Sequence, residues 1–460
     1  MSVQIVPLDS KNLGNRSYLA HDGALAVAVD VPRDVDRMIE LAAVHSVRID
    51  LVVDTHGHGD WLTGGPELAR LVGARYAAPA EIGGAHRETL VMDGTRLTVG
   101  ALELRARHSP GHTPGHISYE LLENDQTVGV FTGGSMLHGA VGRPDLNGAE
   151  HTEALAHAQY VSVRTLAEQL PAEAHVLPMH GFGSFCSATP TSGDSSRIDD
   201  ERRVNPALTQ SEGSFVAELL AGLDAYPAYY ARMAPANAAG PDPVDLSRPP
   251  AVGRAEIHRR ISAGEWVVDL RNRELFAAAH LAGTYNFDGA ENAVTYLGWL
   301  MPAGAALTLL GESVEQVARV QRELALIGVD RPRGMAAGRV EDWVDGSELR
   351  SYRRVRFTDL ATQVGTHPRT SVLDVRRTLE WRTSHLAGAT HIPLHELPGR
   401  LDEVPDGELW VHCGSGFRAS IAASILDRTG RHTVVAVDDD FANAEPAGCR
   451  IVRPQSVPVA

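Results

Sequence analysis

An internal repeat in the second half of the chain constrains the fold more than any other feature. The segment VVDLRNRELFAAAHLAG at 267–283 matches VLDVRRTLEWRTSHLAG at 372–388, and in both copies a histidine follows an aspartate by eleven positions. Downstream, residues 307–328 align without a gap to residues 409–430. Each copy continues with a short apolar run, a loop and a helix-periodic segment that ends at glycine. The repeat predicts two small α/β units, each with a mostly parallel sheet.

The first half of the chain has a different organisation. Residues 1–235 contain short apolar strands, such as 24–31 and 51–53, between loops rich in glycine and histidine. The stretch 236–250 is rich in Pro, Ala and Asp, which is typical of a linker. The length of 460 residues is enough for several domains. We expect three domains, at 1–240, 252–350 and 355–460.

Charge and cysteine content exclude several classes of protein. The 58 acidic and 42 basic residues give a net charge of −16, which argues against a nucleic-acid partner. Three cysteines are too few for a disulfide scaffold, so we expect a reducing, cytoplasmic setting. The first residues lack the pattern of a signal peptide, and no apolar run reaches the length of a membrane span. We therefore expect no membrane partner.

The sequence HCGSGFRAS in the second copy carries the clearest chemistry. A strand at 409–412 ends at Cys413, and a helix is expected from about Ala419. A thiol at a helix N-terminus, close to Arg418, is favoured as the thiolate. The glycines let the loop amides point inward and cradle an anionic sulfur or an oxyanion. The residues of this predicted cradle are Gly414, Ser415, Gly416 and Phe417. The alternative is a buried, inert cysteine.

This loop, together with the DVR and HLAGATHIP segments before it, resembles that of rhodanese domains. The resemblance implies that Cys413 forms a persulfide and passes the outer sulfur to an acceptor, with Arg418 as its catalytic partner. The six-residue loop resembles sulfurtransferases rather than the related phosphatases, whose loop is longer. In the first copy, Gly311 replaces the cysteine and Gln316 replaces the arginine. We therefore predict that the first copy is non-catalytic.

Histidines gather in four ordered segments of the N-terminal block. These segments are DTHGHGDW, HSPGHTPGH, FTGGSMLHGAVGRPDL and LPMHGFGSFC. Alternate residues of an extended loop point the same way, so His56 and His58 can converge on one metal ion. A single His-x-His is weak evidence, whereas four segments with histidine beside glycine strongly indicate a metal site.

The N-terminal block resembles the metallo-β-lactamase fold from NRSYL to HGFGSFC, and within it the persulfide dioxygenases, including those fused to one silent and one active rhodanese domain. The GRPDL and GSFC motifs carry the closer resemblance. The resemblance implies an αββα sandwich and an Fe(II) cofactor, with Zn(II) as the alternative. We also expect a homodimer or higher homo-oligomer, and small sulfur compounds as partners: a low-molecular-weight persulfide, thiosulfate, sulfite or a thiol.

Two positions depart from the family's metal-site pattern. His56 and His112 match two of the three iron ligands of persulfide dioxygenases, but Gly134 stands where the family has the aspartate ligand. Trp61 stands where the signature T-H-x-H-x-D-H has its last histidine. One expectation is that His58 completes a set of His56, His58 and His112. The others are a weak site with water in the gap, or no metal.

Four more residues are candidates for supporting roles. Asp60 and His180 would orient a ligand or contact the substrate, or be satisfied polar residues. Arg143 could hold a substrate carboxylate, and its alternative is a salt bridge to Asp145. Cys186 could line the pocket, or be a small core residue.

The sequence therefore predicts a sulfur-metabolism enzyme with a rhodanese centre and a possible dioxygenase centre. Three rival interpretations stay open. In one, the N-terminal domain is a metal-poor pseudoenzyme and only Cys413 is active. In another, Cys413 is a sulfur carrier whose persulfide is recognised by a partner. In the third, the N-terminal domain is a metal-dependent thioester hydrolase.

Overall fold

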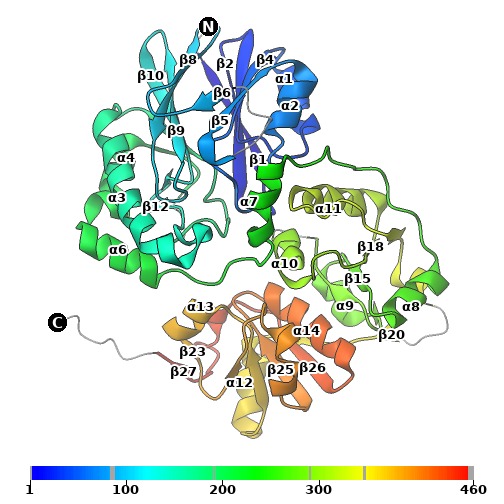
Figure 1. Ribbon diagram of the computed structural model, residues 1–460. Coiled ribbons are helices and arrows are strands. Elements are labelled where there is room, and N and C mark those ends of the chain that lie inside the picture. Colours follow the sequence, from blue (N-terminus) through cyan, green and yellow to red (C-terminus); the bar gives the residue numbers. More distant parts are fainter. Residues whose placement is uncertain are drawn as a thin grey trace. The chain divides into compact units, whose positions relative to one another are not determined.

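The computed structural model describes residues 3–82, 89–189, 191, 193–289, 292–344 and 349–453 (Figure 1). Contacts divide the chain into two compact units. The N-terminal unit comprises residues 1–245 and 322–330, and the C-terminal unit comprises 246–321 and 331–460. Among the described residues, no helix combines the length and the apolar character that crossing a membrane requires.

The N-terminal unit contains two six-stranded sheets (Figure 1). The first has the order β1 (Gln4–Ser10), β2 (Asn15–His21), β3 (Leu25–Val29), β4 (Arg48–Val53), β5 (Arg75–Pro79), β6 (Thr89–Val91). The second has the order β14 (Ser196–Arg197), β13 (His175–Pro178), β10 (Gln126–Gly133), β9 (Ile117–Glu123), β8 (Leu102–His108), β7 (Arg96–Val99). Strands β3 to β6 pair in parallel, as do β10 and β13, so several strands end at one edge.

Alternation along the strands creates the layers of this unit. In β3, Val27 and Val29 face a core that both sheets share, whereas Ala26 and Ala28 face a second core under helices α1 (Asp36–Val44) and α2 (Gly65–Val72). Successive strand residues point to opposite faces, so a strand buried on both faces is apolar throughout. The outer face of the second sheet packs against helices within residues 152–221 and forms a third core with them. These four layers confirm the predicted αββα sandwich.

The helices over the second sheet are α3 (Thr152–Gln169), α4 (Ile198–Val204), α5 (Pro206–Thr209) and α6 (Glu212–Ala221). The predicted linker at 236–250 does not begin where we expected, because α7 (Tyr230–Ala239) includes its first residues. Asn237 on α7 is buried, and its side chain accepts from the Thr63 N–H and donates to the His58 and Trp61 carbonyls. These contacts hold this turn of helix against the N-terminal unit.

The two larger sheets of the C-terminal unit are parallel, as the repeat predicts. The first has the order β17 (Tyr285–Asn286), β15 (Trp266–Asp269), β18 (Leu307–Gly311), β19 (Gly334–Ala337). The second has the order β21 (Arg353–Val355), β26 (His432–Val437), β25 (Gly407–His412), β22 (Ser371–Asp374), β24 (Thr390–His391). The helices are α8 (Arg254–Ser262), α9 (Arg273–Ala278), α10 (Ala293–Leu300), α11 (Val314–Leu326), α12 (Phe357–Thr366), α13 (Thr378–Thr383) and α14 (Phe417–Thr429).

The two copies of the repeat share a buried ion pair. Arg271 donates to the Asp269 carboxylate at 2.6 Å and also to a backbone carbonyl, and Arg376 does the same with Asp374 at 2.7 Å. The D-x-R element of the repeat thus fixes the turn after the first strand in both copies, because the buried charges are paired and hydrogen-bonded.

Candidate metal centre and sulfur-transfer loop

Three buried histidines meet at the edge of the N-terminal sandwich. His56 follows β4, His112 lies in the connection between β8 and β9, and His180 follows β13. All three are fully buried, and their candidate ligand atoms lie within 4.8 Å of one another. Loops at strand ends, held by two packed sheets, bring together residues that are far apart in sequence.

Hydrogen bonds fix which nitrogen of each ring carries the proton. His112 Nδ1 lies 2.8 Å from the Arg143 carbonyl, and His180 Nδ1 lies 2.9 Å from Asn15 Oδ1, so both Nδ1 atoms donate. The Asn15 amide is oriented by its own donation to Asp60 at 2.7 Å. A neutral imidazole that donates from Nδ1 has a bare lone pair on Nε2.

His56 also carries its proton on Nδ1, because this nitrogen donates to the Thr55 hydroxyl. The Thr55 hydroxyl donates to the Asp30 carboxylate at 3.0 Å, so it accepts from His56 Nδ1 at 2.8 Å. His56 Nε2 is therefore also bare, and it faces His180 Nε2 at 3.3 Å. Two lone pairs at this distance repel each other unless a cation lies between them.

The arrangement fits a metal ion. Two imidazole nitrogens that bind one tetrahedral ion at about 2.0–2.1 Å lie about 3.3 Å apart. His112 Nε2 has no hydrogen-bond partner among the described residues, as expected for an atom held ready for an ion. Burial, followed by repulsion from neighbouring imidazoles, lowers the pKa of His112 and of His180 to about 3. The rings are thus neutral, which is the form that binds metals.

His58 is not where we expected it. Its Nε2 lies 3.5 Å from Asp54 and 3.6 Å from Asp30, and these two carboxylates outweigh burial and raise the pKa of His58. The prediction assumed an extended loop, but the chain bends at Thr55–His56 and again at 59–61. Alternate residues therefore face different surroundings. The structure groups His180 with His56 and His112, whereas the His58 ring lies 4.6 Å from the His56 ring but directs its Nε2 toward two acids.

Gly134 leaves no space for the family's aspartate. A Cβ atom at this position would lie 2.1 Å from His112 Cδ2, and the Gly134 N–H already donates to His116 Nε2 at 3.0 Å. His116 in turn contacts Ser109 Oγ at 2.9 Å through Nδ1. The third residue of the histidine cluster is therefore His180, which follows β13, and not a residue at the end of β10.

A Gly134→Asp variant is therefore expected to lose stability rather than regain a ligand. Overpacking of this kind typically costs about 1–3 kcal/mol of unfolding free energy, because the His112 ring must move. Chemical denaturation with and without metal checks this expectation. The matched control is Gly365→Asp, since nothing lies within 4 Å of a Cβ atom there. A Gly134→Asp protein that is as stable as the wild type and binds metal more tightly would contradict it.

Asp60 and Trp61 lie in the same loop as His58. Asp60 accepts from Asn15 and lies 3.6 Å from His180 Nδ1, so it acts on His180 by orienting Asn15. Trp61 is fully buried, and its ring lies edge-on to His58 at 5.9 Å. The bulky indole offers no lone-pair nitrogen to a metal ion.

Arg143 forms the salt bridge that we named as the alternative to a substrate contact. Its guanidinium donates to Asp145 at 2.6 Å and to the Asp224 carbonyl at 2.7 Å, and the side chain is 4% exposed. These contacts fix the position of Arg143, whose own backbone carbonyl accepts from His112 Nδ1 and so orients that ring. Cys186 is fully buried near Asp60 and His180, and burial raises the pKa of its thiol well above the usual value.

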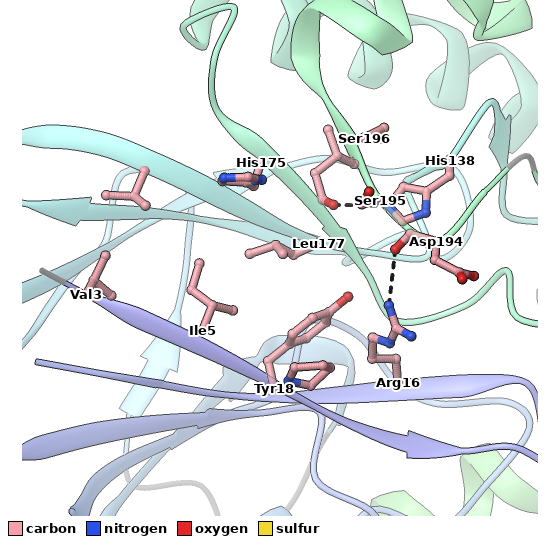
Figure 2. A pocket seen from close by; sticks show the side chains of 13 residues that line it. Val3, Ile5, Arg16, Tyr18, His138, His175, Leu177, Asp194, Ser195 and Ser196 are labelled. Carbon is pink, nitrogen blue, oxygen red and sulfur yellow. Dashed lines mark hydrogen bonds between the residues drawn. The ribbon is translucent and has the colours of Figure 1, made fainter. Parts of the chain in front are cut away.

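The N-terminal unit also has a cavity of about 350 Å³ (Figure 2). Its walls include Val3, Ile5 and Leu177, with Arg16 at the rim, where it donates to the Asp194 carbonyl at 3.3 Å. The side chains in Figure 2 come from both sheets, and the three clustered histidines are not among the residues that line the cavity. The cavity and the histidine cluster are therefore separate features of this unit.

The Cys413 loop joins β25 to α14. The helix begins at Phe417, two residues earlier than expected, so the thiol lies closer to its N-terminus. The Gly416 N–H points at Cys413 Sγ at 3.2 Å. Gly416 has φ +89°, and a Cβ atom there would collide with Asp438, so only glycine permits this turn. Cys413 is 1% exposed, at the base of the loop.

Arg418 is held by a carboxylate that the sequence did not single out. Its two terminal nitrogens donate to the two Glu380 oxygens at 2.5 and 2.7 Å. Burial opposes ionisation of Glu380, but Arg418 prevails and lowers the pKa of the carboxyl to about 2. Sequence reasoning missed Glu380 because 38 residues separate the partners, although it lies in the first turn of α13 after the DVR element.

The first copy of the repeat borders this loop. Tyr296 on α10 contacts the Phe417 ring at 5.8 Å, and Trp299 on the same helix stacks on His395 at 4.6 Å. In the first copy itself, Gln316 Oε1 accepts from the Glu312 N–H at 2.7 Å, and Gln316 Nε2 donates to the Leu270 carbonyl at 2.8 Å. The glutamine side chain thus occupies its own loop, where the second copy has a thiol and a guanidinium.

Comparisons with known proteins match both halves of the chain. Residues 358–444 match the model of the rhodanese-like domain. The human protein "Persulfide dioxygenase ETHE1, mitochondrial" is 31% identical over 185 residues, which are 40% of this chain and 65% of that protein. The Bos taurus protein of the same name is 30% identical over 192 residues, 42% of this chain and 69% of that protein.

A solved structure covers more of the chain. A metallo-beta-lactamase from Staphylococcus aureus subsp. aureus COL aligns with a TM-score of 0.66 and 25% identity over 74% of this chain and 100% of that one. The chain spans about two thirds of the length of the two dioxygenase relatives. The layered fold, the histidine cluster and these matches agree, and the chain belongs to the persulfide dioxygenase family, with a rhodanese-like domain fused at its C-terminal end.

Proposed function

We propose that this chain is a sulfur-metabolism enzyme with two centres, a metal-dependent persulfide dioxygenase and a Cys413 sulfurtransferase. The main support is the convergence of three buried imidazoles whose Nε2 lone pairs face one another. The rhodanese-like domain and the dioxygenase relatives agree with sulfur chemistry at both ends. We further propose domains at 1–240, 252–350 and 355–460, of which the middle one is non-catalytic.

In this proposal His56, His112 and His180 hold the ion. The family resemblance favours Fe(II), with Zn(II) as the alternative, because imidazole nitrogen suits both metals. When bound, an iron ion would supply the activation of O2. The protein fixes the ligands by keeping protons on their Nδ1 atoms, through Thr55 and Asn15 and through the Arg143 carbonyl. The overall reaction consumes a persulfide, O2 and water, and releases a thiol and sulfite.

At the second centre the Cys413 thiolate attacks the outer sulfur of a donor. With thiosulfate, a sulfur–sulfur bond forms to Cys413 as the bond to the sulfite group breaks, so sulfite leaves with its electron pair. An acceptor such as cyanide, sulfite or a thiol then attacks the outer sulfur and restores the thiolate. The Gly416 amide lies where it stabilises negative charge on the sulfur.

Oxygen uptake tests the dioxygenase proposal. The full chain, purified without oxygen and loaded with Fe(II), is expected to consume one O2 for each glutathione persulfide and to release sulfite. A Zn(II)-loaded sample is the control, since zinc has no redox chemistry. Stoichiometric iron without oxygen uptake would refute the dioxygenase. Transfer from thiosulfate to cyanide, measured in the same samples, tests the second centre independently.

A further inference from the structure

Arg418 cannot present its full charge to a sulfur donor. Both terminal nitrogens are taken by Glu380, and the two side chains are only 14% and 29% exposed. Arg418 nevertheless lies against the loop, since its Nη2 is 3.0 Å from where a Cβ atom of Gly414 would be. The positive charge nearest to the loop is therefore largely offset by a carboxylate.

The other charged side chains near the loop do not restore a net positive charge beside it. Arg377 lies 3.6 Å from Glu380 and is partly exposed, so solvent screens it. Asp438 lies beside Gly416 and pairs with Arg273 at 3.1 Å and with Arg354 at 2.7 Å. The loop amides, which carry only partial charges, are then the main attraction for an anion.

We propose that Glu380 determines donor specificity by neutralising Arg418, so that the Cys413 site prefers donors with one negative charge at the reacting end. A persulfide has one such charge, whereas thiosulfate concentrates two on a small group. This inference rests on the proposed sulfur transfer. It assigns Glu380 as a specificity-determining residue that acts through Arg418 and does not touch the reacting sulfur atoms.

The size of the effect follows from Coulomb's law. Without the Glu380 charge, the Arg418 guanidinium has no compensating carboxylate. It then attracts a dianionic donor more strongly than a monoanionic donor, because the dianion carries one more negative charge. Within several ångströms of a partly buried cation, one unit of charge changes relative reactivity by about tenfold or more. The preference should therefore shift measurably toward thiosulfate.

The test measures single-turnover loading of Cys413 from thiosulfate and from glutathione persulfide. The readout is the gain of one sulfur atom in the mass of the full chain. In the variant Glu380→Gln, the ratio of thiosulfate to persulfide loading rates is expected to rise by about tenfold over the wild type. The matched control is Glu403→Gln, which also removes a carboxylate from a bidentate arginine pair, with Arg400, but on an exposed surface.

A double variant distinguishes the effect of the Arg418 charge from an effect of misfolding in the single variant. Glu380→Gln/Arg418→Gln leaves no buried charge unpaired, and its ratio is expected to return close to the wild-type value. A folded Glu380→Gln protein with an unchanged ratio would overturn the inference, and so would an equal rise in the double variant. If the wild type takes sulfur from neither donor, the proposed sulfur transfer itself is refuted, which is a distinct result.

Discussion

Replacing Cys413 by serine is expected to lower the rate of sulfur transfer from thiosulfate to cyanide by at least about 1000-fold, because the nucleophile is lost. Serine fits the loop, but its hydroxyl is a far weaker nucleophile at neutral pH and cannot hold the transferred sulfur. Initial rates of thiocyanate formation measure the effect. The mass of the chain after reaction with thiosulfate should show no added sulfur in the variant.

The other two cysteines provide matched controls in the same chain. Cys186 is fully buried and Cys449 is partly buried, and in both cases burial raises the pKa of the thiol. Cys449→Ser is expected to keep nearly all of the transfer activity, since Cys449 lies in the same unit but outside the loop. A Cys413→Ser variant with more than about a tenth of the wild-type rate would disprove the role of the thiolate.

Replacing His180 by glutamine is expected to weaken metal binding by at least about 100-fold, because one of three converging nitrogens is removed. His58→Gln is expected to leave the affinity close to that of the wild type, since His58 faces Asp30 and Asp54. The same substitution at both positions makes the comparison a matched one. Iron content after anaerobic loading and dialysis against a weak chelator is the measurement.

The opposite result would favour the prediction made from sequence. Loss of iron in His58→Gln, with full retention in His180→Gln, would mean that His58 turns toward His56 and His112 when the ion binds. Thermal unfolding of the metal-free variants shows whether each substitution is tolerated. His56→Gln serves as the positive control, since both interpretations include it as a ligand.

The sequence was sufficient to predict the loops that contain the candidate site residues. His56, His112, His180 and Cys413 each stand beside glycine just after an apolar run or within a short loop, and the structure places all four at such edges. The repeat predicted the two parallel sheets, because the Asp–Arg pair and the helix that ends at glycine recur in both copies.

Contacts that depend on side-chain direction could not be predicted. The bend at Thr55–His56 keeps the His58 ring beside the His56 ring but directs its Nε2 toward Asp54 and Asp30, and nothing in the residue types reveals that bend. The absence of space at Gly134 depends on the His112 ring, which arrives from another strand connection. Glu380 reaches Arg418 from a different helix, so only the fold shows that the guanidinium charge is offset.

The product that the intact, iron-loaded chain forms from glutathione persulfide and oxygen decides whether two centres act in one protein. Sulfite released at the histidine centre should take the outer sulfur from the Cys413 persulfide, so thiosulfate is expected to accumulate faster than in enzyme-free controls. The Cys413→Ser chain should consume oxygen at the same rate and release sulfite. Equal thiosulfate formation by both chains, or no oxygen uptake by either, would contradict the two-centre proposal.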